Sequence, residues 1–320
     1  MWGLSTWQIF GAITAVAKIL RLDGQQIRHA FGLGGVSAPV PYIRKFGHAE
    51  TERPYSWAKN NYGWASMGAV VACLLARRGF VGNRCILDGE HGFWVMAGSD
   101  RCDFQAMTAG LGEEYLLPKT GFKPYACCRL AHTTLDAVGS IRARGPINPA
   151  QIVRVDIHTF SEVVENLGGP QPTSIIDAQF HLPYLVALEL LDRSPRRGLT
   201  EADLADPAVL GLMRKVTLHL DREADRGFFE QGLSPAHVVV ALSDERRLEA
   251  SAEVPTGSPG GLPFTSEDLA EKFQTLVTPV IGPTQARELE AIILELDGRN
   301  AADLVRHTVP ASERLRTRSG

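Results

Sequence analysis

Apolar residues near the start of the chain recur at the spacing of an amphipathic helix. Within residues 5–24 the repeat runs through Ile9, Ile13, Val16, Ala17 and Leu20. Intervals of three and four residues place such side chains on one face of an α-helix. Ser5 or Thr6 is a candidate N-cap, and Gly24 is a candidate stop. The pattern therefore predicts a helix that begins almost at the first residue and ends near Gly24.

Two further helices are predicted before residue 80. Residues 25–37 carry the small-residue sequence GLGGVSA, which we expect to form a close-packed face buried in a homodimer. Residues 62–78 have one apolar face, made of Trp64, Met67, Val71, Leu74 and Leu75. The apolar run within this helix, 67–76, is shorter than a membrane span. We therefore predict a buried helix and no membrane association.

The periodicity changes to that of strands after about residue 120. Residues 151–160 and 215–221 alternate apolar and polar positions, and residues 236–255 do so on both sides of an Asp-Glu pair, as in a β-hairpin. A helical pattern interrupted or preceded by Pro183 occupies 174–192, and a shorter helical pair follows it. Strands and helices are thus mixed in the middle of the chain.

The last part of the chain returns to helices after a linker. Residues 255–265 are rich in Gly, Pro and Ser, and capping signals follow at Ser266 and Thr284. We therefore predict an α+β protein, with a mainly helical domain formed by both chain ends and a smaller α+β domain inserted between them. The predicted boundaries are 1–120 and 262–320 for the helical domain and 121–261 for the inserted domain.

Composition and charge narrow the class of protein. The 320 residues are 44% hydrophobic and 22% charged, as in an ordinary globular protein. A net charge of −3 supplies no basic field for a nucleic acid, so we predict no nucleic-acid partner and a small acidic ligand held by a few local cations. Five cysteines, two of them adjacent, do not suit a secreted disulfide framework, and we predict a cytoplasmic protein.

Residues 121–132, GFKPYACCRLAH, bring together cations, thiols and an imidazole. A metal site is disfavoured because the cysteines lack the spacing of zinc or iron–sulfur ligands. A cysteine nucleophile beside Lys123, Arg129 and His132 would have a lowered pKa, but small cysteines packed at a domain junction are the favoured explanation of Cys127 and Cys128. The remaining interpretation is a cationic pocket for an acidic substrate.

A second stretch, residues 56–66, supports the cationic interpretation. Lys59 and Tyr62 lie at the start of a predicted helix, where a lysine side chain can project into a cleft beside exposed backbone donors. Both side chain types transfer protons when they are desolvated. The alternative is a solvated lysine at a helix start and a tyrosine in the core.

Four segments resemble the MmgE/PrpD family, in the order that the family has them. They are residues 10–35, 58–93, 123–132 and 175–192, and together they cover most of the chain. The family includes 2-methylcitrate dehydratases, cis-aconitate decarboxylases and an iminodisuccinate epimerase. The resemblance implies a helical domain formed by both chain ends, an inserted α+β domain, a homodimer, and catalysis without a metal or an organic cofactor.

The resemblance also implies roles for individual residues. Lys59 and Lys123 occupy the family's two active-site lysine positions, which suit carboxylate binding and proton transfer. We assign Tyr62 to hydrogen bonding or acid catalysis. Arg129 and His132 are assigned to substrate binding, although an ion pair for the arginine and a packing role for the histidine stay open. Tyr184, in FHLPY, falls where family members place a tyrosine near the pocket mouth.

Three activities follow from this interpretation. The first is a cofactor-independent lyase, a dehydratase or decarboxylase, that acts on a 2-methylcitrate-like di- or tricarboxylate. The second is an epimerase that uses the same proton abstraction. The third is an inactive chain that binds a ligand or partner, because family members carry a further helical segment ahead of Met1 of this chain, and Trp2 stands near a position where many have histidine.

Overall fold

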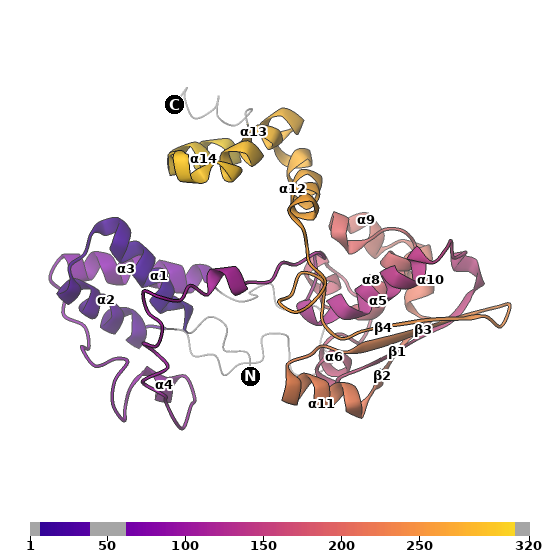
Figure 1. Cartoon of the computed structure of the whole chain (residues 1–320), viewed down its shortest axis with the longest axis horizontal. Helices are drawn as coiled ribbons and strands as arrows, with labels where there is room; N and C mark the ends of the chain where they lie inside the picture. The colour runs from indigo at the N-terminus through magenta and orange to yellow at the C-terminus, as the bar shows by residue number, and fades with distance from the viewer. Residues whose placement is uncertain (1–6, 39–61, 311–320) are drawn as a thin grey trace. The chain divides into compact units, whose positions relative to one another are not determined.

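The computed structural model describes residues 7–38 and 62–310, which fall into two compact units (Figure 1). The first unit contains the described residues up to Tyr115, and the second begins at Leu116. Each unit has its own core. Lys59 and the candidate caps Ser5 and Thr6 lie outside the described residues.

The described residues of the first unit form three long helices and one short one. Their bounds are α1 (Gln8–Leu20), α2 (Gly24–Val36), α3 (Tyr62–Arg77) and α4 (Phe93–Met96). The predicted stop at Gly24 is wrong, because α1 ends where Arg21 adopts a left-handed conformation with φ 55°. Gly24 is instead the first residue of α2, and Asp23 caps that helix in a capping box with Gln26.

Glycines of α2 allow the first unit to pack tightly. A Cβ on Gly34 would lie 2.4 Å from Cδ1 of Ile13, and one on Gly32 would lie 2.2 Å from the backbone oxygen of Asn83. Only glycine fits such close approaches. Gly32 and Gly34 are therefore buried inside the unit, and the expectation that these glycines are reserved for a dimer partner is wrong.

The predicted inward face of α3 is also wrong. Ala65, Ala69 and Cys73 are the buried residues, and they face α1 and α2 in the core of this unit. Trp64 is 62% exposed and Met67 is 50% exposed within the described residues. Small side chains let the helix backbones approach closely, so the small-residue face packs inward and the large apolar face of α3 points out of the unit.

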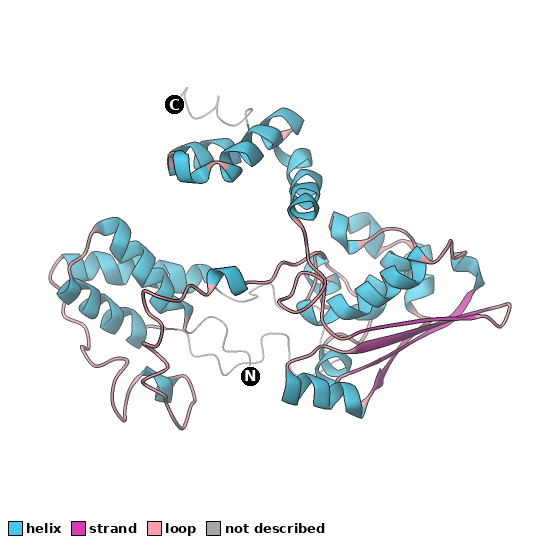
Figure 2. Ribbon diagram, viewed as in Figure 1, coloured by secondary structure: helices cyan, strands magenta, loops and turns pink. Residues whose placement is uncertain are grey.

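The second unit contains a four-stranded mixed sheet with the order β2-β1-β3-β4 (Figure 2). The strands are β1 (Ile152–Thr159), β2 (Val216–Leu220), β3 (Ala236–Leu242) and β4 (Arg247–Ala252). The pairing of β1 with β2 is parallel, and the other two pairings are antiparallel. The predicted strands and the hairpin are confirmed.

Helices surround this sheet in the second unit. They are α5 (His132–Ala143), α6 (Ser161–Asn166), α7 (Ile175–Ala178), α8 (Leu182–Leu190), α9 (Glu201–Leu204), α10 (Pro207–Met213) and α11 (Arg222–Gln231). Helix α5 packs on β3 and β4, and α8 packs between α5, α10 and β2. Pro183 stands in the first turn of α8, where a missing N–H costs nothing, so the predicted interruption before α8 is confirmed.

The end of the described chain is helical, as predicted. Its helices are α12 (Ser266–Ile281), α13 (Pro283–Leu294) and α14 (Ala301–Thr308). The predicted capping positions Ser266 and Thr284 are wrong, because α12 is capped by Thr265 in a capping box with Asp268, and α13 begins after Gly282. Short 3₁₀ turns complete the described elements at Leu117–Lys119, Arg129–Ala131, Pro149–Gln151, Pro195–Arg197 and Leu296–Gly298.

The α+β class is confirmed by this mixture of helices with a single mixed sheet. Helices α12–α14 group with the second unit, where α12 contacts the turn at Pro195–Arg197. The prediction that both chain ends join in one helical domain stays a prediction. Among the helices that the structure describes, none has the length and apolar character needed to cross a membrane.

Candidate carboxylate-binding site

The segment 121–129 folds back on itself through its lysine. The ammonium of Lys123 donates a hydrogen bond to the backbone carbonyl of Cys127 at 2.9 Å. Pro124 follows the lysine and biases its backbone toward an extended conformation. The side chain of Lys123 is thereby held in one direction, and the ammonium keeps two further N–H donors for a ligand.

Arg129 ties this segment to the predicted linker. Its guanidinium donates to the backbone carbonyl of Phe122 at 2.6 Å and to the hydroxyl of Ser258. The backbone N–H of Phe122 in turn donates to the carbonyl of Gly257 at 2.7 Å. The linker is therefore an anchored loop. The bonds of Arg129 to neutral oxygens position the loop, and among the described residues its guanidinium forms no ion pair, so the carboxylate clamp stays a prediction.

His132 begins α5 and is completely buried. Neither ring nitrogen has a hydrogen-bond partner of standard geometry, although the Cys127 backbone favours the protonated form. Burial, followed by the charges of Arg129 and Lys123, lowers the pKa of His132 to about 3. His132 is consequently a neutral imidazole at physiological pH. Its position next to these cations agrees with a supporting role and makes it a poor base.

Lys272 is a member of this cluster that sequence reasoning missed. It comes from α12, and its ammonium donates to the backbone carbonyl of Lys123. Burial and the charge of Lys123 lower its pKa, and its own charge contributes to the lowered pKa of His132. A lysine on an amphipathic helix is typical of a solvated face, so the pattern of residues 266–281 carried no signal for this contact.

A hydrogen-bonded network around Asp136 contacts His132 through Tyr125. The hydroxyl of Tyr125 donates to Asp136 at 2.9 Å, and the same carboxylate accepts a bond from the backbone N–H of Thr256 at 2.8 Å. The guanidinium of Arg196 stacks over the Tyr125 ring at 4.8 Å. The Tyr125 and His132 rings meet edge to face at 5.2 Å. Burial, with a contribution from Asp136, raises the pKa of Tyr125, which therefore stays protonated.

The other predicted site residues are not brought to this cluster by the described contacts. Tyr62 is the first residue of α3 in the first unit and is 42% exposed. Tyr184 is fully buried in α8. Burial raises its pKa, and the next contribution comes from Asp203 rather than from Lys123 or Lys272. Their roles in a site stay predictions, as does that of Lys59.

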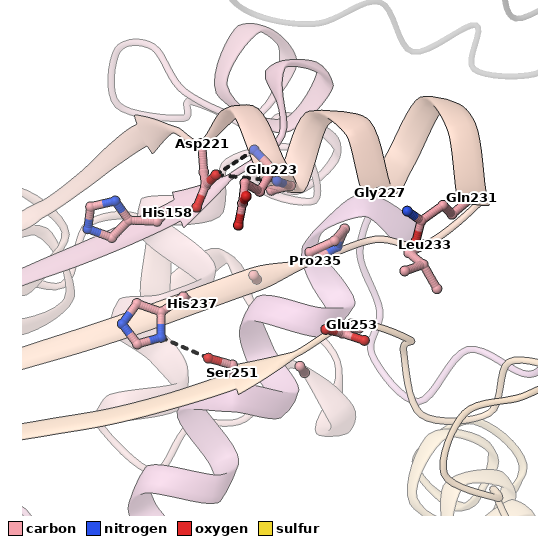
Figure 3. A pocket seen from close by; sticks show the side chains of 13 residues that line it. His158, Asp221, Glu223, Gly227, Gln231, Leu233, Pro235, His237, Ser251 and Glu253 are labelled. Atoms are coloured by element: carbon pink, nitrogen blue, oxygen red, sulfur yellow. Dashed lines mark hydrogen bonds between the residues drawn. The ribbon is translucent and has the colours of Figure 1, made fainter.

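A pocket of about 370 Å³ lies elsewhere in the second unit, beside the sheet and α11 (Figure 3). His158 of β1 and His237 of β3 are among the residues that line it. They belong to a row of histidines in register across three strands, in which His158 stacks on His219 with ring centroids 4.8 Å apart. The remaining polar residues of the lining include Asp221, Glu223, Gln231, Ser251 and Glu253. This pocket shares no residue with the cation cluster.

The two adjacent cysteines of the second unit, Cys127 and Cys128, have the surroundings of packing residues. Cys127 is 4% exposed, and its thiol contacts the Cys128 carbonyl at 3.6 Å. None of the five cysteines forms a disulfide. Among residues 7–38 and 62–310, no three His, Cys, Asp or Glu side chains are grouped so as to hold a metal ion. These observations favour the packing interpretation of both adjacent thiols.

Fold and site together define an α+β protein with a cationic cluster near the start of the unit that contains the sheet. The chain belongs to the MmgE/PrpD family, since the model of the family's C-terminal domain matches residues 125–298 and that of its N-terminal domain matches residues 1–105. The resemblance of the chain to this family is thereby confirmed.

The similar proteins are all named after cis-aconitate decarboxylase. A cis-aconitate decarboxylase of Aspergillus terreus is 26% identical over 300 residues, which are 88% of this chain and 59% of that protein. A cis-aconitate decarboxylase-like protein of Aspergillus oryzae is 24% identical over 92% of this chain and 62% of its own. The human cis-aconitate decarboxylase is 23% identical over 90% and 58%. The chain thus spans less than two thirds of the length of these relatives.

Proposed function

We propose that the chain is part of a lyase that acts on a di- or tricarboxylate, and that decarboxylation of a cis-aconitate-like acid is its first candidate reaction. The observation that carries this proposal is the cluster of Lys123, Arg129 and Lys272 around the neutral His132. Three cations collected in one place favour a ligand with several negative charges. The names of the similar proteins support the choice of decarboxylation.

The chemistry requires charge stabilisation and one proton. Loss of CO₂ breaks a carbon–carbon bond, and the electron pair left on the substrate is delocalised toward a remaining carboxylate before a proton is added to carbon. Ammonium groups placed beside that carboxylate stabilise the developing charge more than the ground state. Lys123 is held in position for this role by Pro124 and the carbonyl of Cys127.

The proton donor is proposed to come from the family's second lysine position. We assign proton transfer to Lys59 together with Lys123, and hydrogen bonding or acid catalysis to Tyr62. Tyr184 is proposed as a residue near the pocket mouth. Lysine and tyrosine are suited to these roles because both carry a proton at neutral pH. Each can release this proton when its surroundings disfavour the protonated form, which is the charged form for lysine and the neutral form for tyrosine.

Dehydration of a 2-methylcitrate-like acid is the second candidate reaction. It needs the same carboxylate binding, with removal of a proton next to a carboxylate and protonation of the leaving hydroxyl. Epimerisation of a dicarboxylate would use the proton abstraction alone. All three reactions are proposed to need no metal or organic cofactor.

Incubation of the purified protein with cis-aconitate or 2-methylcitrate in deuterated buffer tests the proposal. Proton NMR would detect a decarboxylated or dehydrated product, and mass spectrometry would detect deuterium in unreacted substrate. We expect a product with one of the two acids, and unchanged turnover after dialysis against EDTA. Deuterium in recovered substrate without any product would favour the epimerase. No product and no exchange with either acid would overturn the enzymatic proposal.

A further inference from the structure

We infer that Lys272 of α12, together with Lys123, binds a carboxylate of the ligand and makes the site selective for acids with several carboxylates. The inference rests on the proposed function, since it concerns the same cation cluster. Lys272 is the member of that cluster contributed by the C-terminal helices, and it lies outside the segments that carried the family resemblance.

The two lysines are positioned by backbone oxygens instead of by acids. Lys272 donates to the carbonyl of Lys123, and Lys123 donates to the carbonyl of Cys127. An ammonium has three N–H donors, so each lysine keeps two after forming its bond to the backbone. Both ammonium groups are thereby fixed in place with donors available to an anion.

Among the described residues, no acid is paired directly with the cations of the cluster. Within residues 7–38 and 62–310, neither ammonium nor the guanidinium of Arg129 forms an ion pair with an Asp or Glu side chain. The carboxylate of Asp136 contributes to the field at Arg129 but is bonded to Tyr125 and Thr256. The Asp268 carboxylate on α12 is engaged in the capping box. Bringing Lys272 near Lys123 without an acid costs free energy, which a bound polycarboxylate would offset.

His132 fits the same interpretation. A protonated imidazole at this position would repel the three cations of the cluster. The buried imidazole is neutral near neutral pH, so the positive charge of the cluster comes from Lys123, Arg129 and Lys272 alone. The site therefore provides two ammonium groups, while the buried His132, which packs edge to face on the ring of Tyr125, adds no charge near neutral pH. Such a site would discriminate among acids by their number of carboxylates.

Binding of unreactive acids tests the inference without any turnover. The probes are tricarballylate, glutarate and butyrate, with three, two and one carboxylates, measured by isothermal titration calorimetry at low salt. In the Lys272→Gln variant the amide can still donate to the Lys123 carbonyl while the charge is lost. We expect about tenfold weaker binding of tricarballylate, a smaller loss for glutarate, and butyrate binding within about twofold of wild type.

Two further variants separate charge from folding. Lys272→Arg keeps the charge and should keep the preference for tricarballylate, while Lys18→Met removes an exposed lysine of α1 and should change nothing. Unchanged tricarballylate affinity in folded Lys272→Gln would overturn the inference even if the enzyme turns over substrate. Conversely, selective loss of tricarballylate binding would sustain it even if no lyase activity is found.

Discussion

The ammonium of Lys272 donates a hydrogen bond to the backbone carbonyl of Lys123, although 149 residues separate the two in the sequence. The contact joins α12 to the segment that contains the family's lysine position. It makes the C-terminal helices part of the candidate site. The ammonium of Lys272 is bonded to the carbonyl of Lys123, whereas the ammonium of Lys123 is bonded to the carbonyl of Cys127. Predictions for individual residues follow from this arrangement.

Replacing Lys123 by Met should abolish most of the turnover and leave the fold intact. An ammonium beside a partly desolvated carboxylate contributes about 2–4 kcal/mol to transition-state stabilisation, which corresponds to roughly a hundred- to thousandfold in rate. Cys127→Ala and Cys128→Ala should cost little activity, since both thiols are interpreted as packing groups. Turnover is compared after thermal melts confirm folding. An inactive cysteine variant beside an active Lys123 variant would establish the thiol nucleophile instead.

His132 should make the protein less stable in acid. Unfolded, its imidazole binds a proton near its ordinary pKa of 6.5, whereas in the folded protein burial lowers the pKa to about 3. Between these values the unfolded chain binds more protons at this residue, so the free energy of unfolding falls by about 1.4 kcal/mol per pH unit as the pH falls. Urea titrations between pH 7 and pH 4 measure the slope.

The matched variants for this test are His132→Gln and His91→Gln. The first removes the buried titrating group and should flatten the slope, while the second removes an exposed histidine of the first unit and should keep it. Equal slopes in wild type and His132→Gln would show that the acid sensitivity arises elsewhere.

Asp136 should matter for stability more than its partial exposure suggests. Asp136→Ala leaves the Tyr125 hydroxyl and the Thr256 N–H without their acceptor, and we expect a loss of about 2 kcal/mol in the free energy of unfolding. Asp100→Ala, at a side chain that is 96% exposed, is the control and should stay within about 0.5 kcal/mol of wild type. Denaturant unfolding of both variants measures the difference, and similar values for the two would contradict the assigned role.

The exposed apolar face of α3 should be covered in the assembled protein. We predict that the C-terminal helices cover it, because the sequence favours one helical domain formed by both chain ends. Trp64→Ala should then lower the free energy of unfolding by about 3 kcal/mol, as at a packed position. A change of less than about 0.5 kcal/mol would instead show a side chain in water. Deletion of residues 262–320 should increase binding of a hydrophobic dye to the remaining chain.

A homodimer remains the predicted assembly. The buried glycines of α2 cannot supply its interface, so the exposed large apolar side chains outside the α3 face are the available surface. Sedimentation velocity at micromolar concentrations should show a dimer. A compact monomer at all concentrations would contradict this prediction.

The strands were predictable where apolar and polar residues alternate, and β3 shows this most clearly. In β3 the buried residues stand at every second position, so the period of two is visible in the letters themselves. The helix α3 misled for the opposite reason. Its large residues form an obvious apolar stripe, but Ala65 and Ala69 decide which face packs inward, and alanine adds little to a hydrophobic pattern.

Only those residues of the candidate site that are close together in the sequence could be predicted. Lys123, Arg129 and His132 lie within ten positions of one another, and a local cluster of unusual residues is detectable in a sequence. Lys272 and Asp136 join them through tertiary contacts, and each occupies a helix where a charged residue is ordinary. The lowered pKa of His132 likewise depends on burial that no local pattern expresses.

The hydrogen bonds of the loop 255–262 restrict where residues can be inserted or deleted in related chains. Its backbone is bonded at Thr256 to Asp136, at Gly257 to Phe122, and internally between Gly257 and Leu262. Gly257 has φ 79°, and a Cβ there would lie 2.9 Å from the Phe122 carbonyl. An inserted or deleted residue would therefore displace the start of α12 and carry Lys272 away from Lys123. Related chains should keep the length of this loop and accumulate their insertions in the hairpin turn at Asp244 and Glu245 instead.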